Sequence, residues 1–273
     1  MHASISNKKE EEDGVSVDPI VESLQIIPIK GIPDVKEGDD IAELIYSAQK
    51  KMNLISKDGD IYVIAQKVVS KAEGRLVKLS EVKPSRFAEQ LAASIGKDAR
   101  EVQLILDESR SIVKARLGIL ITETKHGIVC ANSGIDMSNV NSKDNPHESA
   151  LLLPVDPDLS AKTIRMGLER RLGKRIAVII SDTFGRPWRE GHVDFAIGVS
   201  GIECFRDYRG KKDMYGRELR VTLMAQVDEL AAAAELVMGK ARAIPAALIR
   251  GFRYRPAEGS ASLIRPIERD LFR

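Results

Sequence analysis

The chain has 273 residues, long enough for one large domain or two joined lobes, and its charges nearly balance at a formal net charge of +2. That balance argues against the extended basic face of nucleic-acid-binding proteins, and no stretch approaches the ~18 consecutive apolar residues of a membrane span. The N-terminus lacks the apolar core of a secretion signal, and both cysteines lie in apolar runs. We therefore expect a cytoplasmic protein with neither a nucleic-acid nor a membrane partner.

Runs typical of β-strands begin after residues 1–18, whose charged composition predicts a disordered extension. The predicted strands are 24–29, 61–65, 119–122, 127–131, 175–180, 196–200, 219–224 and 246–249. Three helices are predicted between them. The first covers 41–52, where apolar residues share one face, the second runs from a cap at Ser160 to Gly173, and the third spans about 227–238 and ends at Gly239.

The order of these elements indicates the fold class. Strands that follow one another directly, as at 119–122 and 127–131, occur beside strand–helix alternation. We therefore predict an α+β fold with mixed, largely antiparallel sheets and packed helices. Two intimately joined lobes are expected, with a possible boundary near the polar segment 141–147.

Neither of the common glycine-rich nucleotide-binding motifs, GxxxxGK[ST] or GxGxxG, is present, yet four loops combine glycine with polar groups. The turn 28–34 brings Gly31 between two prolines, which suits either an ordinary turn or a close contact with a ligand. In segment 66–75, Lys67 and Lys71 share one face if the preceding strand continues. That face suits either a phosphate or the solvated edge of a sheet.

The other two loops carry hard oxygen donors. Asp136 lies among amides and hydroxyls in 132–139, which fits either half of a Mg²⁺ or Mn²⁺ site or an Asx-turn. Asp182 and Thr183 follow an apolar run, where we expect the strand to stop and a loop to begin. That loop suits metal and phosphate binding, or a salt-bridged turn with Trp188 as a lid. Together the four loops favour a metal-assisted phosphate site.

These loops resemble the coenzyme F420:L-glutamate ligase family, whose members extend the γ-linked glutamate tail of the deazaflavin coenzyme F420. The resemblance covers about residues 22–251. In chain order its motifs are GIP at 31–33, KEGDD at 36–40, SKAEGR at 70–75, GID at 134–136, SNV at 138–140, LLLPVDPD at 151–158, DT at 182–183, GR at 185–186, FAIG at 195–198, KDMYGREL at 212–219 and MG at 238–239. It implies a ligase domain over 19–251, a C-terminal tail over 252–273 and an intertwined homodimer.

The implied reaction depends on GTP. The lactyl carboxylate of coenzyme F420-0 would be converted to an acyl phosphate, and L-glutamate would displace phosphate to form an amide. Glutamate would then be added through a γ-linkage. Such a reaction needs no covalently modified side chain, in keeping with the lack of a Ser–His or Cys–His signature; His126 and His192 are interpreted as surface histidines. The alternatives are a non-catalytic deazaflavin- or nucleotide-binding homologue and an amide ligase for a different acid.

The resemblance also implies the residues of the site. The implied GTP contacts are Gly31, Ile32, Pro33, Asp34, Gln66, Lys67, Lys71, Asn139, Met238, Gly239, Lys240, Ala241, Arg242, Ala243, Ile244 and Pro245. The implied ligands of two divalent cations, Mg²⁺ or Mn²⁺, are Asp136, Asp182 and Thr183, with K⁺ as an activator. Lys240 departs from the acidic residue of some relatives, so the second ion would have fewer protein ligands, or Lys240 would contact a phosphate. The base for amide formation stays open between Glu190 and a metal-bound water.

Overall fold

A five-stranded sheet forms the centre of the computed structural model, which describes residues 23–137 and 148–271. In spatial order its strands are β1 (Gln25–Pro28), β12 (Ala246–Arg250), β2 (Ile61–Ala65), β8 (Ala177–Arg186) and β9 (Arg189–Ser200). Only β2 and β8 pair in parallel within this sheet, and the other neighbours are antiparallel. The predicted α+β class with mixed, largely antiparallel sheets is therefore confirmed.

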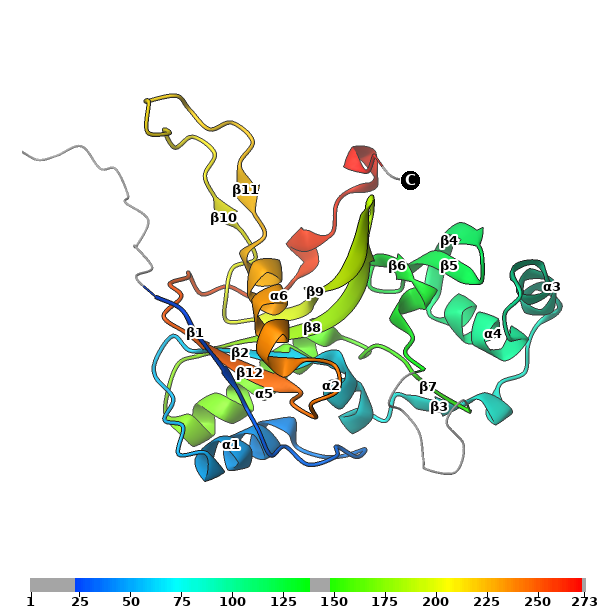
Figure 1. Ribbon diagram of the computed structural model, residues 1–273, viewed down its shortest axis with the longest axis horizontal. Coiled ribbons are helices and arrows are strands. Elements are labelled where there is room, and N and C mark those ends of the chain that lie inside the picture. The colour runs from blue at the N-terminus through cyan, green and yellow to red at the C-terminus, as the bar shows by residue number, and fades with distance from the viewer. Residues whose placement is uncertain (1–22, 138–147, 272–273) are drawn as a thin grey trace, which may run out of the picture.

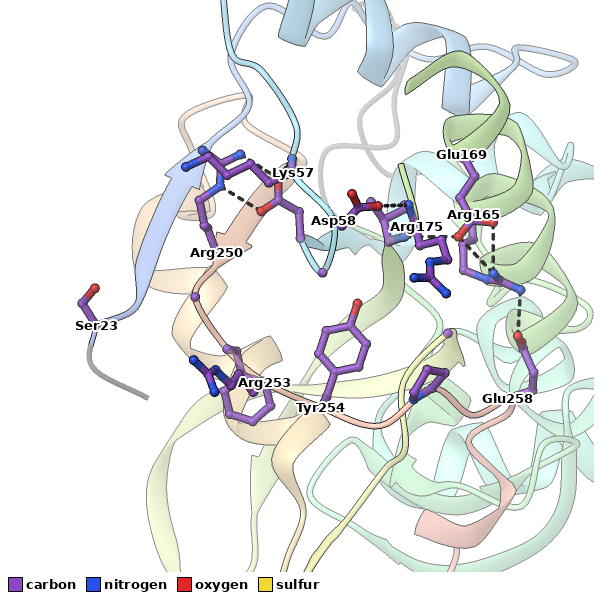
Figure 2. A pocket seen from close by; sticks show the side chains of 17 residues that line it. Ser23, Lys57, Asp58, Arg165, Glu169, Arg175, Arg250, Arg253, Tyr254 and Glu258 are labelled. Carbon is purple, nitrogen blue, oxygen red and sulfur yellow. Dashed lines mark hydrogen bonds and ion pairs between the residues drawn. The ribbon is translucent and has the colours of Figure 1, made fainter. Parts of the chain in front are cut away.

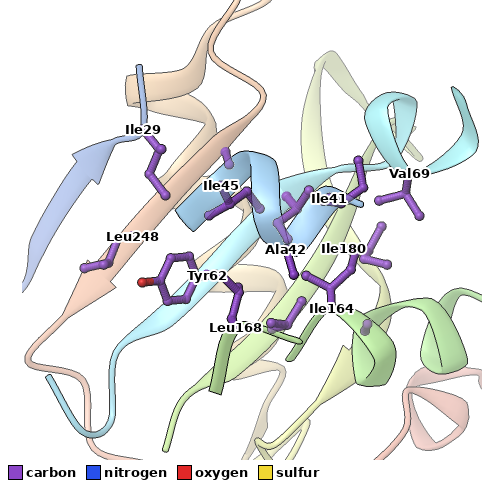
Figure 3. Close-up of a cluster of buried hydrophobic side chains, with 14 of the residues drawn as sticks. Ile29, Ile41, Ala42, Ile45, Tyr62, Val69, Ile164, Leu168, Ile180 and Leu248 are labelled. Carbon is purple, nitrogen blue, oxygen red and sulfur yellow. The ribbon is translucent and has the colours of Figure 1, made fainter. Parts of the chain in front are cut away.

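Helices cover both faces of this sheet, which explains why its central strands are apolar at successive positions. Tyr62 and Ile64 of β2 pack against α1 (Ile41–Lys51) and α5 (Pro157–Leu172), as Figure 3 shows for Tyr62. Their neighbours Ile61 and Val63 point to the opposite face and pack against α6 (Gln226–Met238). The layers are visible in Figure 1, with α6 on one side of the sheet and α1 and α5 on the other.

A smaller group of elements lies beside the central sheet (Figure 1). These are α3 (Arg86–Ile95), α4 (Ala99–Asp107) and the antiparallel strands β4 (Ser109–Arg116), β5 (Ile119–Thr124) and β6 (Val129–Ala131), and apolar side chains of α3 and α4 pack with Leu120 of β5. The pair β3 (Leu76–Lys78) and β7 (Ser149–Leu151) lies between this part and α2 (Gln66–Ala72). The division into two lobes stays a prediction, because the proposed boundary at 141–147 is outside the described residues.

Short elements complete the described chain. The strands β10 (Arg206–Asp207) and β11 (Leu223–Met224) form the base of a long arm that projects from the body in Figure 1. The 3₁₀ turns are η1 (Leu79–Glu81), η2 (Asn132–Gly134), η3 (Ala261–Leu263) and η4 (Ile267–Arg269). No helix in the described ranges combines the length and apolar character needed to cross a membrane.

Several local predictions differ from the structure. Of the strand predicted over 219–224, only Leu223–Met224 forms a strand. The condition that β2 continues past residue 65 is not met, because the chain turns into helix α2, in which Ser70 donates an i,i+4 hydrogen bond of 2.8 Å to Gln66. Strand β8 does not stop at residue 180 but pairs with β9 as far as Arg186. Helix α5 begins at Pro157, with Asp156 as the cap in place of Ser160.

Candidate active site

A cavity of about 780 Å³, here called the strand-end cavity, opens where β2 ends and β12 begins, beside the middle of β8. The last residue of β2, Ala65, pairs in parallel with Ser181, so the cavity lies at the carboxyl end of β2, where loops and helix starts gather side chains. The cavity is lined by residues 32–35, 65–68, 71, 136, 181–183, 192, 194, 235, 238–241 and 243–245. Segments far apart in the sequence thus meet around one space.

One wall of the cavity is acidic. Asp182 and Thr183 lie in β8, opposite Phe195 and Asp194 of β9, and Asp136 reaches the same cavity from the segment before β7. Burial raises the pKa of Asp182 to about 7, and the negative charges of Asp136 and Asp194 add to the rise, although the Thr183 amide and a nearby lysine oppose it. The Asp182 carboxyl therefore keeps its proton up to about neutral pH, because its ionisation would place a third negative charge on this buried wall.

A buried carboxylate organises this wall. The Asp194 side chain is only 4% exposed and accepts hydrogen bonds from Ser181 (Oγ–Oδ2 3.1 Å) and Thr183 (Oγ1–Oδ1 2.6 Å). Lys240 contributes its ammonium, with Nζ 2.8 Å from Asp194 Oδ1 and in hydrogen-bond contact with Thr183 Oγ1. The ammonium thus lies among oxygen atoms that also suit a metal ion.

Helix α2 supplies basic side chains to the cavity. Lys67 Nζ lies 2.5 Å from Asp136 Oδ2, and Lys71 Nζ lies 2.8 Å from Asp34 Oδ1. Gln66 is buried, and its amide nitrogen makes no hydrogen bond with any residue that the structure describes. A buried donor left in this state costs free energy unless a ligand or water accepts from it, so its place on the cavity wall favours a polar ligand there.

The loop after α6 closes a third side. Gly239 ends α6 with φ +61° and ψ 165°, a conformation essentially restricted to glycine, and Ala243 also has a positive φ of 52°. The turn brings the loop back into β12 so that its backbone borders the cavity. Such a turn needs glycine at 239, which accounts for the Met-Gly pair at the end of the helix.

Most of the residues implied as GTP contacts line this cavity. They are Ile32, Pro33, Asp34, Gln66, Lys67, Lys71, Met238, Gly239, Lys240, Ala241, Ala243, Ile244 and Pro245. Gly31 and Arg242 flank lining residues without lining the cavity themselves, and Asn139 lies outside the described residues. Asp136, Asp182 and Thr183, implied as metal ligands, all line it.

The donor atoms on the acidic wall fit a divalent cation. Carboxylate and hydroxyl oxygens are the ligands that Mg²⁺ and Mn²⁺ prefer, and Mg²⁺ is commonly held by one or two carboxylates together with phosphate oxygens. Within the described ranges, no three His, Cys, Asp or Glu side chains gather closely enough to hold an ion by themselves. A cation at Asp136 and Asp182 would therefore need oxygen atoms from a substrate or water.

Sequence reasoning missed four polar lining residues, Ser181, His192, Asp194 and Glu235. A signal for Asp194 existed, because it is an acidic residue that immediately precedes a mostly apolar run in β9. His192 is exposed, as expected, but lies at the cavity. The open candidate Glu190 does not line the cavity, and Trp188 is 88% exposed at the β8–β9 turn, so it forms no lid over it.

The chain is similar to known proteins over most of its length. A family model described as F420-0:Gamma-glutamyl ligase matches residues 30–251. The coenzyme F420:L-glutamate ligase of Methanothermobacter thermautotrophicus is 47% identical over 254 residues, which is 92% of this chain and 99% of that protein. The proteins of the same name from Methanopyrus kandleri and Archaeoglobus fulgidus are 45% and 43% identical, each over 92% of this chain and over 98% and 96% of their own lengths. Because the match spans most of the sequence, the chain belongs to the F420-0:gamma-glutamyl ligase family and is a ligase.

Proposed function

We propose that this ligase joins L-glutamate to the lactyl carboxylate of coenzyme F420-0 and then adds γ-linked glutamate, converting GTP to GDP and phosphate. The names of the relatives support the glutamate and F420 substrates. The observation that carries the nucleotide is the strand-end cavity itself, in which lysines lie beside carboxylates: Lys67 pairs with Asp136, Lys71 with Asp34 and Lys240 with Asp194. Cations and oxygen donors lining one space suit a metal-bound polyphosphate.

The reaction requires activation of a carboxylate, which is a poor acyl donor. In the first step a carboxylate oxygen attacks the γ-phosphorus of GTP, the bond from that phosphorus to the β–γ bridging oxygen breaks, and GDP leaves. In the second step the α-amine of glutamate attacks the acyl carbon, the bond from that carbon to the phosphate oxygen breaks, and the amine loses a proton as phosphate departs. Both steps bring anions together, so positive charge must compensate for their repulsion.

The side chains of this protein supply that charge. Lys67 and Lys71 lie on one helix at the cavity, where their ammonium groups are placed to contact phosphate oxygens in exchange for their present carboxylate partners. The Gln66 amide offers an uncharged donor beside them. Lys240 pairs with Asp194 and so neutralises one carboxylate of the acidic wall.

Asp136, Asp182 and Thr183 would hold the divalent cations, Mg²⁺ or Mn²⁺. When bound, such ions would withdraw charge from the phosphate oxygens and orient the nucleotide. The raised pKa of Asp182 fits this role, because a cation would relieve the same repulsion that the proton relieves in the metal-free protein. Because the Lys240 ammonium already contacts Thr183, we propose that one ion has fewer protein ligands in this chain than in relatives with an acidic residue there. Activation by K⁺ belongs to the same proposal.

We also propose that the protein works as an intertwined homodimer. Three apolar side chains of the arm between β10 and β11, Met214, Tyr215 and Val221, are 86–88% exposed. Exposed apolar side chains gathered on a projecting hairpin are typical of a surface that a partner covers. A second copy of the chain is the partner that the family resemblance favours, and light scattering of the purified protein measures its mass directly.

A single assay tests the enzymatic proposal. The purified chain is incubated with GTP, Mn²⁺, L-glutamate and coenzyme F420-0, and mass spectrometry should detect a coenzyme heavier by one glutamyl unit with an equal amount of GDP. Asp136→Ala should abolish GDP formation while its far-ultraviolet circular dichroism stays that of the wild type. Binding without turnover would indicate a non-catalytic homologue. GDP release only with a different acceptor would indicate a ligase for another acid, and robust turnover by Asp136→Ala would overturn the metal assignment.

A further inference from the structure

A second cavity, here called the distal cavity, lies at the opposite end of the central sheet and is shown in Figure 2. Its volume is about 910 Å³. Strand β2 runs between the two cavities, from Asp60 beside the distal cavity to Ala65 at the strand-end cavity, and β12 returns from Pro245 to Arg250. Since a strand rises roughly 3.3 Å per residue, the two sites are separated by about 15 Å of sheet.

The carboxylates of the distal cavity already have partners. Asp60 is 1% exposed and accepts two hydrogen bonds from the Arg250 guanidinium, at 2.9 and 2.6 Å. Glu169 and Glu258 both bind Arg165, at 3.1 and 2.7 Å (Figure 2). The remaining acid, Asp58, accepts from a backbone amide and lies 3.6 Å from the ammonium of Lys174. These pairs stiffen the walls and leave no carboxylate unpaired among the lining residues.

The cations of the distal cavity do not all have partners. The side chains of Lys57 and Arg253 make no hydrogen bond or ion pair with any part of the chain that the structure describes, and the Arg175 guanidinium has only a longer-range attraction to Asp58. The Tyr254 hydroxyl also makes no hydrogen bond with the described part of the chain. In Figure 2 the Tyr254 ring lies between Arg175 and Arg253. Burial raises the pKa of Tyr254 to about 12, so the hydroxyl stays a hydrogen-bond donor. The lining therefore presents an excess of donors.

The backbone around these donors is preformed by glycines in the left-handed region. Gly59, Gly201 and Gly251 have φ values of 83°, 86° and 97° and come from three different loops. A Cβ at Gly201 would lie 2.8 Å from the carbonyl oxygen of Ile176, and one at Gly251 would lie 2.3 Å from that of Ser23. Larger residues would push the loops apart, so the shape of the distal cavity depends on these close approaches.

We propose that the distal cavity binds a small anion carrying two or more phosphate or carboxylate groups, at a site separate from the one used by the ligase reaction. Guanidinium groups bind both kinds of oxyanion bidentately, and the positions of Arg175 and Arg253 on either side of Tyr254 suit a ligand with two charged ends. A third cation, Lys57, adds charge at the rim. Since the three cations are exposed, binding is salt-sensitive.

Isothermal titration of the full-length protein tests this site, with pyrophosphate and citrate as probes and with divalent ions removed beforehand by passage over a chelating resin. The double variant Arg175→Gln/Arg253→Gln should weaken binding of the preferred probe by about tenfold or more, because two charge-assisted contacts are lost. Tyr254→Phe should weaken it about threefold. Comparing the probes tells a phosphorylated ligand from a polycarboxylate, and either result supports an oxyanion site.

Two matched variants make the experiment decisive. Lys67→Gln/Lys71→Gln removes the cations of the strand-end cavity, and Lys114→Gln/Arg116→Gln removes two exposed charges from β4. Both should leave the affinity within about twofold of the wild type, and raising the salt from about 50 to 500 mM should weaken binding. Loss of binding in the first control, equal loss in all variants, or no binding of either probe to the wild type would overturn the proposal.

Discussion

Replacing Asp182 by asparagine is expected to stabilise the metal-free protein at neutral and alkaline pH. Burial raises the pKa of the Asp182 carboxyl from 3.8 to about 7, and the charges of Asp136 and Asp194 contribute in the same direction. A rise of that size corresponds to about 4 kcal/mol of free energy of unfolding. Asparagine therefore removes a carboxyl group whose ionised form is costly in the folded protein.

The sign follows from where the proton is held. In the unfolded chain the Asp182 carboxyl ionises near pH 3.8, whereas in the folded chain it keeps its proton to about pH 7. Between these values the folded state binds more protons, so the free energy of unfolding falls as the pH rises. Asparagine does not ionise. The variant should therefore exceed the wild type by up to about 4 kcal/mol at pH 8 and match it closely near pH 4.

Urea unfolding at about pH 4, 6 and 8, with a chelator present, measures both free energies. The control is Asp207→Asn, because Arg209 lowers the pKa of the exposed Asp207 to about 2 and its replacement should bring no gain at pH 8. Adding Mg²⁺ should stabilise the wild type and leave Asp182→Asn unchanged, while the variant should lose ligase activity. Parallel pH curves for the wild type and Asp182→Asn would refute the reasoning.

Three further substitutions separate binding from folding. Lys71→Ala removes an exposed pair with Asp34, so the free energy of unfolding measured in urea should change by less than about 0.5 kcal/mol. Titration should show GTP binding weakened about tenfold, and an unchanged GTP affinity would contradict the role of Lys71. Asp194→Ala leaves the Ser181 hydroxyl and the Lys240 ammonium without their acceptor, so the free energy of unfolding in urea should fall by about 2–3 kcal/mol. Wild-type stability of this variant would contradict the hydrogen-bond assignment. Gly198→Ala places a Cβ 2.3 Å from the carbonyl oxygen of Pro157, so the free energy of unfolding should fall by about 3 kcal/mol or more and the melting temperature should drop. An unchanged melting temperature would show that β9 and α5 can move apart to accept the methyl group.

The sheet was predictable where the sequence is uniformly apolar. Strand β2 has the predicted bounds because both of its faces are buried, which leaves no polar residue to interrupt the run. Strand β8 extends further than predicted because residues 181–183, which line the strand-end cavity, and the residues that follow stay paired with β9; polarity alone cannot distinguish such a strand from a loop. Helices α3 and α4 were missed although their N-caps, Ser85 and Asp98, were visible signals.

The motifs indicated residues that the structure brings to one cavity, but they did not indicate how those residues pair. The sequence indicated that Asp136 and Asp182 carry oxygen donors, and the cavity brings both to one place. It did not indicate that Lys67 would pair with Asp136, because that contact requires α2 to turn the lysine inward after β2. The role of Asp194 was also hidden, since it depends on the register between β8 and β9.

The three carboxylates of the acidic wall are balanced in different ways. Lys67 neutralises Asp136 and Lys240 neutralises Asp194, whereas Asp182 has no ion pair among the described residues and keeps a proton instead. A wall filled by permanent apolar packing would be more stable but would offer no oxygen atoms to a cation. Under the proposed function, the substrate complex displaces these positive charges and this proton, and the free energy given up at Asp182 keeps the wall available for a cation and its phosphates.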